Sequence, residues 1–238
     1  MKRALWLGVL PLALSVSSFG SSCGTIASPT TCSITVGGTN TFTVSGFNLV
    51  TASATGGGNV YDGTDFDIDI SSGGGLTLLM TFSKHAAANG VVFLANSGQT
   101  ASFIFQYNVA LSPAVAGTTT FTAPDAVSFP QSSASGTGLS TSQMILSDGQ
   151  NGTSCQAIRN SGGLTQGNCN TLPANLAAVL QVSNIVSLTG NTGNTSVLSL
   201  SNLIDSSFTA GAAATPEPST YALVGLSLAG LGLLRRRR

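Results

Sequence analysis

The segment from Thr100 to Leu111 reads Thr-Ala-Ser-Phe-Ile-Phe-Gln-Tyr-Asn-Val-Ala-Leu and is the clearest structural signal in the chain. Polar residues such as Ser102, Gln106 and Asn108 occupy one parity of this segment. The other parity is apolar throughout: Ala101, Phe103, Phe105, Tyr107, Val109 and Leu111. Successive side chains of a strand point to opposite faces of its sheet, so this alternation predicts a half-buried antiparallel strand.

Short apolar runs separated by Gly, Ser, Thr and Asn continue on both sides of this segment. Strands with such turns predict an all-β fold, an antiparallel β-sandwich or jelly roll, formed by residues 21–209. A β-solenoid is the alternative, but the glycines and asparagines follow no fixed period. The further strands expected are 41–50, 59–70, 76–82, 91–95, 118–121, 140–146, 178–188 and 196–204, with Gly73–Gly75 as a turn, 113–117 and 130–138 as loops, and a short helix at 175–180.

Charge is scarce and concentrated at the two ends of the chain. Only 7% of the 238 residues are charged. Lys84 and Arg159 are the only cations between the two ends, where seven aspartates also lie, which gives 2 − 7 = −5. A nucleic-acid-binding surface needs clustered cations to neutralise phosphates, so this composition excludes nucleic acid as a partner.

Residues 1–20 have the pattern of a secretory signal peptide. Lys2 and Arg3 precede an apolar run from Ala4 to Leu14, and small residues follow up to Gly20. This order predicts export through the Sec translocon and cleavage by signal peptidase before Ser21.

The C-terminus combines three elements in a fixed order. Pro216-Glu217-Pro218 is followed by an uncharged apolar stretch at 219–234 and then by Arg235, Arg236, Arg237 and Arg238. About 16 residues of helix span about 24 Å, so the stretch predicts a short transmembrane helix. The arginines place its C-terminal end in the cytoplasm, and small residues at 210–215 predict a flexible stalk before it.

This tail resembles the PEP-CTERM sorting signal at residues 216–238. The resemblance implies a Gram-negative bacterium that makes extracellular polysaccharide, with an exosortase, a membrane cysteine protease, as the processing partner. It implies an inner-membrane intermediate, cleavage near Pro216-Glu217-Pro218, and final location at the cell surface or outside the cell. Unrelated domains carry such tails, so the resemblance leaves the body open.

The four cysteines form two pairs that are near in sequence. Export brings the chain into an oxidising compartment, and the spacing favours disulfides Cys23–Cys32 and Cys155–Cys169 over the two crossed pairings. The CxxC spacing typical of zinc sites does not occur among them.

Four aspartates lie within eight residues, at Asp62, Asp65, Asp67 and Asp69. On a strand, Asp65, Asp67 and Asp69 would share one face. Carboxylates repel one another there, and they would either protect a solvent-exposed sheet edge from pairing or bind calcium. The spacing does not fit an EF-hand loop, so calcium is the weaker of the two hypotheses, and no other cofactor is expected.

His85 is the only histidine, beside Lys84, and is expected in a loop. The chain lacks a Gly-x-Ser-x-Gly elbow, and residues 21–209 contain no glutamate. No catalytic residues can be assembled from this pattern. We therefore expect a non-enzymatic structural or adhesive component of the extracellular polysaccharide matrix. A carbohydrate- or calcium-binding β-sandwich module is the first alternative, and a secreted hydrolase is the second.

Overall fold

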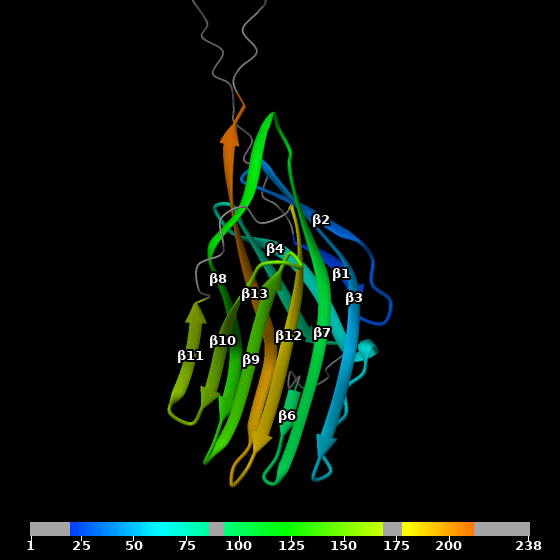
Figure 1. Ribbon diagram of the computed structural model, residues 1–238. Helices are drawn as coiled ribbons and strands as arrows, with labels where there is room; N and C mark the ends of the chain where they lie inside the picture. The colour runs from blue at the N-terminus through cyan, green and yellow to red at the C-terminus, as the bar shows by residue number, and fades with distance from the viewer. Residues whose placement is uncertain (1–19, 86–92, 169–177, 212–238) are drawn as a thin grey trace, which may run out of the picture.

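The computed structural model describes residues 20–85, 93–168 and 178–211, which form antiparallel strands (Figure 1). This part of the chain has no α-helix, and its one helical turn is the 3-10 helix η1 (Gly63–Asp65). The strands are β1 (Ser21–Thr25), β2 (Cys32–Val36), β3 (Asn40–Thr55), β4 (Phe66–Gly74), β5 (Thr77–Lys84), β6 (Phe93–Ala95), β7 (Gln99–Pro113), β8 (Gly117–Ala134), β9 (Gly138–Ser147), β10 (Gly152–Asn160), β11 (Gly163–Asn168), β12 (Val179–Gly190) and β13 (Thr195–Ala210).

The strands form two packed layers, which confirms the predicted antiparallel β-sandwich. One layer has the order β1-β4-β5-β13-β8, and the other has the order β10-β9-β12-β7-β3-β2. We call them the first layer and the second layer. Strand β11 joins them on one side, since it pairs with β10 through residues 163–166 and with β8 through Gly167 and Asn168. Strand β6 pairs with β13 in addition.

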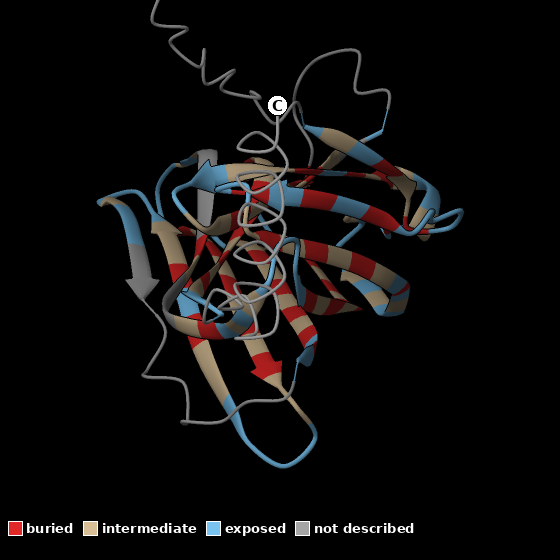
Figure 2. Ribbon diagram, turned by 90° about the horizontal axis from the view of Figure 1, so that it is seen from above, coloured by how far each residue is buried: buried red, intermediate tan, exposed pale blue. Residues whose placement is uncertain are grey.

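The alternation predicted for Thr100–Leu111 is observed in β7. Ala101, Phe103, Phe105 and the other residues of that parity are buried, whereas the residues between them are partly exposed. The same alternation runs along β9 and β12, the strands beside β7 (Figure 2). Twelve consecutive residue pairs join β12 to β7 without a bulge. One face of the second layer is therefore buried against the first layer, and it is largely apolar, with Ser140, Ser142 and Asn184 as polar members.

Aromatic side chains fill the space between the layers. Phe82 of β5 packs on Phe105 of β7 with ring centroids 4.4 Å apart, and Phe66 of β4 lies 5.1 Å from Phe103. Tyr61 closes this cluster, where its hydroxyl accepts a hydrogen bond of 2.9 Å from the Leu94 N–H, and burial raises its pKa. Each such ring removes a large apolar area from water on folding.

The open side of the sandwich lies between β1 and β2, the two ends of the strand order. A disulfide between Cys23 of β1 and Cys32 of β2 joins the two layers there, with the Cα atoms 5.4 Å apart. Cys23 is fully buried, and its carbonyl accepts a 2.9 Å hydrogen bond from the Thr30 N–H. The predicted Cys23–Cys32 pairing is confirmed. The disulfide joins β1 to β2, which are not paired by a ladder of backbone hydrogen bonds.

Several predicted boundaries are wrong. The expected strand 59–70 begins only at Phe66, because residues 63–65 form η1. Residues 130–134, expected in a loop, belong to β8 because β13 provides hydrogen-bonding partners along this stretch. The expected helix at 175–180 is wrong at Ala178, which is a bend, and at Val179 and Leu180, which begin β12; residues 175–177 lie outside the described residues. Strands β1, β2, β10 and β11 were not predicted.

The turn predicted at Gly73–Gly75 is shifted toward the C-terminus: Gly73 and Gly74 belong to β4, and Gly75 and Leu76 form the turn to β5. Gly74 and Gly75 have φ angles of +104° and +57°, which side-chain-bearing residues rarely adopt. At the far end, Ala210, expected to begin the stalk, is the last residue of β13, and residues 212–215 lie outside the described part.

Candidate functional site

Asp65, Asp67 and Asp69 do not share one strand face, contrary to the sequence prediction. Asp65 is the last residue of η1, whereas Asp67 and Asp69 point outward from β4. Strand β4 is not an edge of the sheet, since it pairs with β1 on one side and with β5 on the other. Protection of a free edge is therefore not the role of these carboxylates.

Asp62 and Asp65 stabilise the turn before β4 through a reciprocal cap. The Asp62 carboxylate accepts a 2.7 Å hydrogen bond from the Thr64 N–H, and Asp65 Oδ2 accepts one of 2.9 Å from the Asp62 N–H. The hydroxyl and N–H of Thr64 stabilise the charged form of Asp62 and lower its pKa. This is the capping arrangement that fixes the start of a helical turn.

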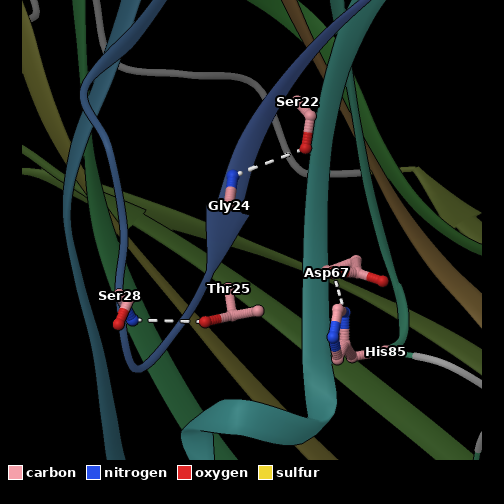
Figure 3. Close-up of polar contacts among 6 residues, drawn as sticks. All are labelled: Ser22, Gly24, Thr25, Ser28, Asp67 and His85. Carbon is pink, nitrogen blue, oxygen red and sulfur yellow. Dashed lines mark hydrogen bonds and ion pairs between the residues drawn. The ribbon is translucent and has the colours of Figure 1, made fainter.

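Asp67 pairs with His85, which lies just after β5 (Figure 3). The distance from His85 Nδ1 to Asp67 Oδ1 is 2.7 Å, and the side chains are 56% and 32% exposed. The His85 N–H also donates a 2.7 Å hydrogen bond to the Asp65 carbonyl. His85 therefore helps to hold the end of β5 against the turn that precedes β4.

The His85–Asp67 pair provides two of the three residue types of a Ser-His-Asp catalytic triad. Among the described residues, however, the Asp67 contact is the only side-chain hydrogen bond of His85. Thr25, which lies opposite Asp67 on β1, uses its hydroxyl to accept a hydrogen bond from the Ser28 N–H (Figure 3). The described geometry therefore supplies no activated nucleophile beside the pair.

The calcium hypothesis loses its geometric basis, because the four carboxylates have different positions and partners. Within residues 20–85, 93–168 and 178–211, no group of three or more His, Cys, Asp or Glu side chains is arranged to hold a metal ion. Calcium needs six to eight converging oxygens. Calcium binding at Asp62, Asp65, Asp67 and Asp69 stays an untested prediction.

Among the described residues, the outward sides of β2, β3, β7, β12 and β9 form an extended face that is mainly polar and has no charged side chain, although apolar residues such as Ile104 and Ile185 also lie on it. Rows of hydroxyl and amide residues cross it from strand to strand: Ser53, Ser102 and Ser187 lie opposite one another on β3, β7 and β12. We call this surface the hydroxyl face. It consists of Ser33, Thr35, Thr41, Thr43, Ser45, Thr51, Ser53, Thr55, Thr100, Ser102, Ile104, Gln106, Asn108, Ala110, Leu139, Thr141, Gln143, Ile145, Gln181, Ser183, Ile185, Ser187 and Thr189.

Cross-strand hydrogen bonds hold many of these side chains in place. Ser53 and Ser102 are 2.8 Å apart through their hydroxyls, and Thr55 and Thr100 are 2.6 Å apart. The Gln106 amide donates a 2.8 Å bond to the Ser183 hydroxyl. Each hydroxyl can both donate and accept, so every pair keeps hydrogen-bonding capacity for a partner in solution. Sequence reasoning found the polar parity of β7, but it did not predict that neighbouring strands would extend it into a face.

The first layer has a different outward surface. Asp67 and Asp69 of β4 and Asp205 of β13 lie on it. The hydroxyl of Thr77 donates a 2.5 Å hydrogen bond to Asp205. The sandwich thus has one acidic side and one uncharged side.

Cys155 lies on β10 and is disulfide-bonded, and its predicted partner Cys169 lies outside the described residues. Residues 1–19 of the predicted signal peptide, the stalk beyond Gly211, and the sorting residues Pro216, Glu217, Pro218 and Arg235–Arg238 also lie outside them. In the described residues, no helix has the length and apolar character needed to cross a membrane.

The C-terminal residues 214–238 match the family model of the PEP-CTERM protein-sorting motif. The chain carries a PEP-CTERM sorting motif. This confirms the resemblance noted in the tail, and it implies export, a membrane-anchored intermediate and processing by an exosortase that sorts the protein to the cell surface. Comparison with curated proteins and with solved structures gives no match to the chain. The PEP-CTERM motif therefore indicates the destination of the protein. It gives no information about the function of the β-sandwich.

Proposed function

We propose that the protein is a non-enzymatic structural or adhesive component of the extracellular polysaccharide matrix, and that the hydroxyl face is its contact surface. The observation that carries the proposal is an uncharged hydrogen-bonding surface on a protein that is sorted to the cell surface. Sugar hydroxyls are donors and acceptors of the same kind as serine and threonine hydroxyls. The partner class is therefore a neutral glycan chain.

The shape of the hydroxyl face favours a long polymer over a single small sugar. Its rows continue across several strands, and the side chains are held by their cross-strand hydrogen bonds, so little side-chain freedom is lost on binding. Each row offers a similar, weak set of hydrogen bonds. Affinity then comes from many contacts along one polysaccharide chain, as in other multivalent binding.

The surface composition supports an adhesive role over a discrete carbohydrate-binding pocket. Sugar-binding modules stack their ligands on exposed aromatic rings. In the described part of this chain, the exposed large apolar residues are aliphatic: Val50, Val60, Val115, Leu164 and Val179. The aromatic rings are instead used in the core between the layers.

The test is co-sedimentation of the purified protein with extracellular polysaccharide isolated from the native host. A variant with Ser53→Glu and Ser187→Glu places two charged side chains on either side of Ser102 in the hydroxyl face. The matched control, Thr120→Glu with Ser196→Glu, places two such side chains on the first layer, where both residues also form hydroxyl pairs.

We expect the hydroxyl-face variant to lose most of the bound fraction, by about tenfold, while the control stays within twofold of the unmodified protein. An added carboxylate opposes binding of a neutral glycan through its bulk and hydration. Equal binding by the two variants, with both correctly folded by circular dichroism, would overturn the proposal.

A further inference from the structure

Asn184 is a polar residue in the middle of the apolar core. It lies on β12 between Val182 and Val186 in the inward parity, and it is fully buried. Neither its amide nitrogen nor its amide oxygen has a hydrogen-bond partner in the protein. Exchanging the two atoms by a flip of the amide changes nothing, since both lack a partner. Buried polar groups in folded proteins are nearly always satisfied, so this amide requires an explanation.

Other unsatisfied polar groups lie beside it. Asn184 is directly opposite Met144 of β9, and the next inward residue on β9 is Ser142. The Ser142 hydroxyl is also buried without a partner. Residues related in this diagonal way across two strands lie about 7–8 Å apart at their Cα atoms, which is a distance that one bridging molecule can span.

A third group lies on the other side of Asn184 along β12, since Ser142 is opposite Val186 whereas Tyr107 is opposite Val182. Asn184 lies opposite Phe105 of β7, and the next inward residue on β7 is Tyr107. Asn202 of β13 reaches across from the first layer and donates a 2.5 Å hydrogen bond to the Tyr107 hydroxyl. The other amide atom of Asn202, its oxygen, is buried without a partner.

We propose that Asn184, Ser142 and Asn202 form an internal hydration site between the layers, with one water molecule on each side of Asn184 along β12. Water offers two donors and two acceptors, which match the donor of Asn184, the oxygens of both amides and the hydroxyl of Ser142. The three residues carry no charge, so they offer no counter-charge for a buried metal cation or anion. An apolar guest would leave all four atoms unsatisfied.

The first test is magnetisation transfer from water to the Asn184 side-chain amide, measured by NMR on the full-length protein in detergent micelles. A bound water gives an intermolecular nuclear Overhauser effect at the assigned Asn184 amide protons, although this side chain is fully buried. The control is the backbone amide of Phe42, which is fully buried in the interior strand β3 between β2 and β7, and which should give no such effect. Absence of the effect at Asn184 would overturn the proposal.

The second test is thermal unfolding of Asn184→Leu, which keeps the side-chain volume and removes the polar atoms. If water is bound, the leucine displaces it and leaves Ser142 and Asn202 unsatisfied, so the melting temperature should fall by several degrees. If the core is dry, the same substitution removes two unsatisfied groups and should raise the melting temperature. A rise would contradict the proposal, and the first test remains decisive should this variant fail to fold.

Discussion

Removing the Cys23–Cys32 disulfide should open the sandwich at one particular seam. The two cysteines lie on β1 and β2, the end strands of the two layers, and between them the disulfide replaces a hydrogen-bonded ladder. Strand β1 is otherwise held to β4 by three residue pairs with an irregularity after Ser22. A variant with Cys23→Ala and Cys32→Ala tests this role without reducing the disulfide of Cys155.

The size of the effect follows from the loop that the disulfide closes. A sequence separation of 9 residues corresponds to a loss of unfolded-chain entropy worth about 2.5 kcal/mol. For a domain of this size, 1 kcal/mol shifts the melting temperature by about 2–4 °C, so a fall of about 5–10 °C is expected. Both cysteines are buried, and the alanines leave a small cavity that adds to the loss.

Hydrogen-deuterium exchange locates the change. Amides of β1 and β2 should exchange faster in the variant, while those of β7 and β12, in the centre of the second layer, keep their protection. The matched control is Cys155→Ala with Cys169→Ala, which should destabilise the protein without a selective effect on β1 and β2. A melting temperature unchanged within 1 °C, or the same exchange pattern in both variants, would refute the claim that the Cys23–Cys32 disulfide holds β1 against β2.

Three further predictions test other parts of the structure. Phe105→Ala should lower the free energy of unfolding by about 3–5 kcal/mol because Phe105 is fully buried, whereas Ile104→Ala, on the outward face, should cost far less; similar losses in denaturant unfolding would contradict the assigned parity. Asp62→Ala should lower the melting temperature at pH 7 but not in strong acid, and Asp62→Asn should retain most of the cap. Because the pKa of Asp62 is lowered in the folded state, its contribution to folding stability is complete above about pH 4, the ordinary range of aspartate. This contribution is lost as the pH falls through the folded-state pKa. A loss of stability in Asp62→Ala that does not depend on pH would refute the charged cap. Millimolar calcium, compared with chelator, should leave the melting temperature unchanged, and a rise of several degrees that Asp67→Asn abolishes would instead establish the calcium site.

The sequence predicts the core best where apolar alternation is uninterrupted. Strand β7 was predicted because six inward residues follow one another at strict alternation, and burial of that parity is confirmed. Strand β10 was missed because Gly152–Asn160 carries few apolar residues, and it is stabilised by pairing with β9 and β11. Residues 130–134 have the composition of a loop, but β13 provides their hydrogen bonds. Local composition cannot reveal such long-range pairing.

The sites depend even more on pairing between distant segments. The Cys23–Cys32 bond was predicted from spacing, but its place at the open seam depends on the order of all the strands. Asp65 was expected on the strand with Asp67, and the cap with Asp62 moves it into a helical turn. Asn184 has the inward parity of β12, yet only the register with β7 and β9 shows which groups surround it.

The most direct measurement is the intact mass of the protein extracted from the extracellular polysaccharide of the native host. We predict a chain that begins near Ser21, ends at or near Pro216-Glu217-Pro218, and contains two disulfides. Such a mass would demonstrate export, exosortase processing and location in the matrix in a single measurement. A matrix-bound form that still ends at Arg238, or a protein found only in the membrane fraction, would contradict the account.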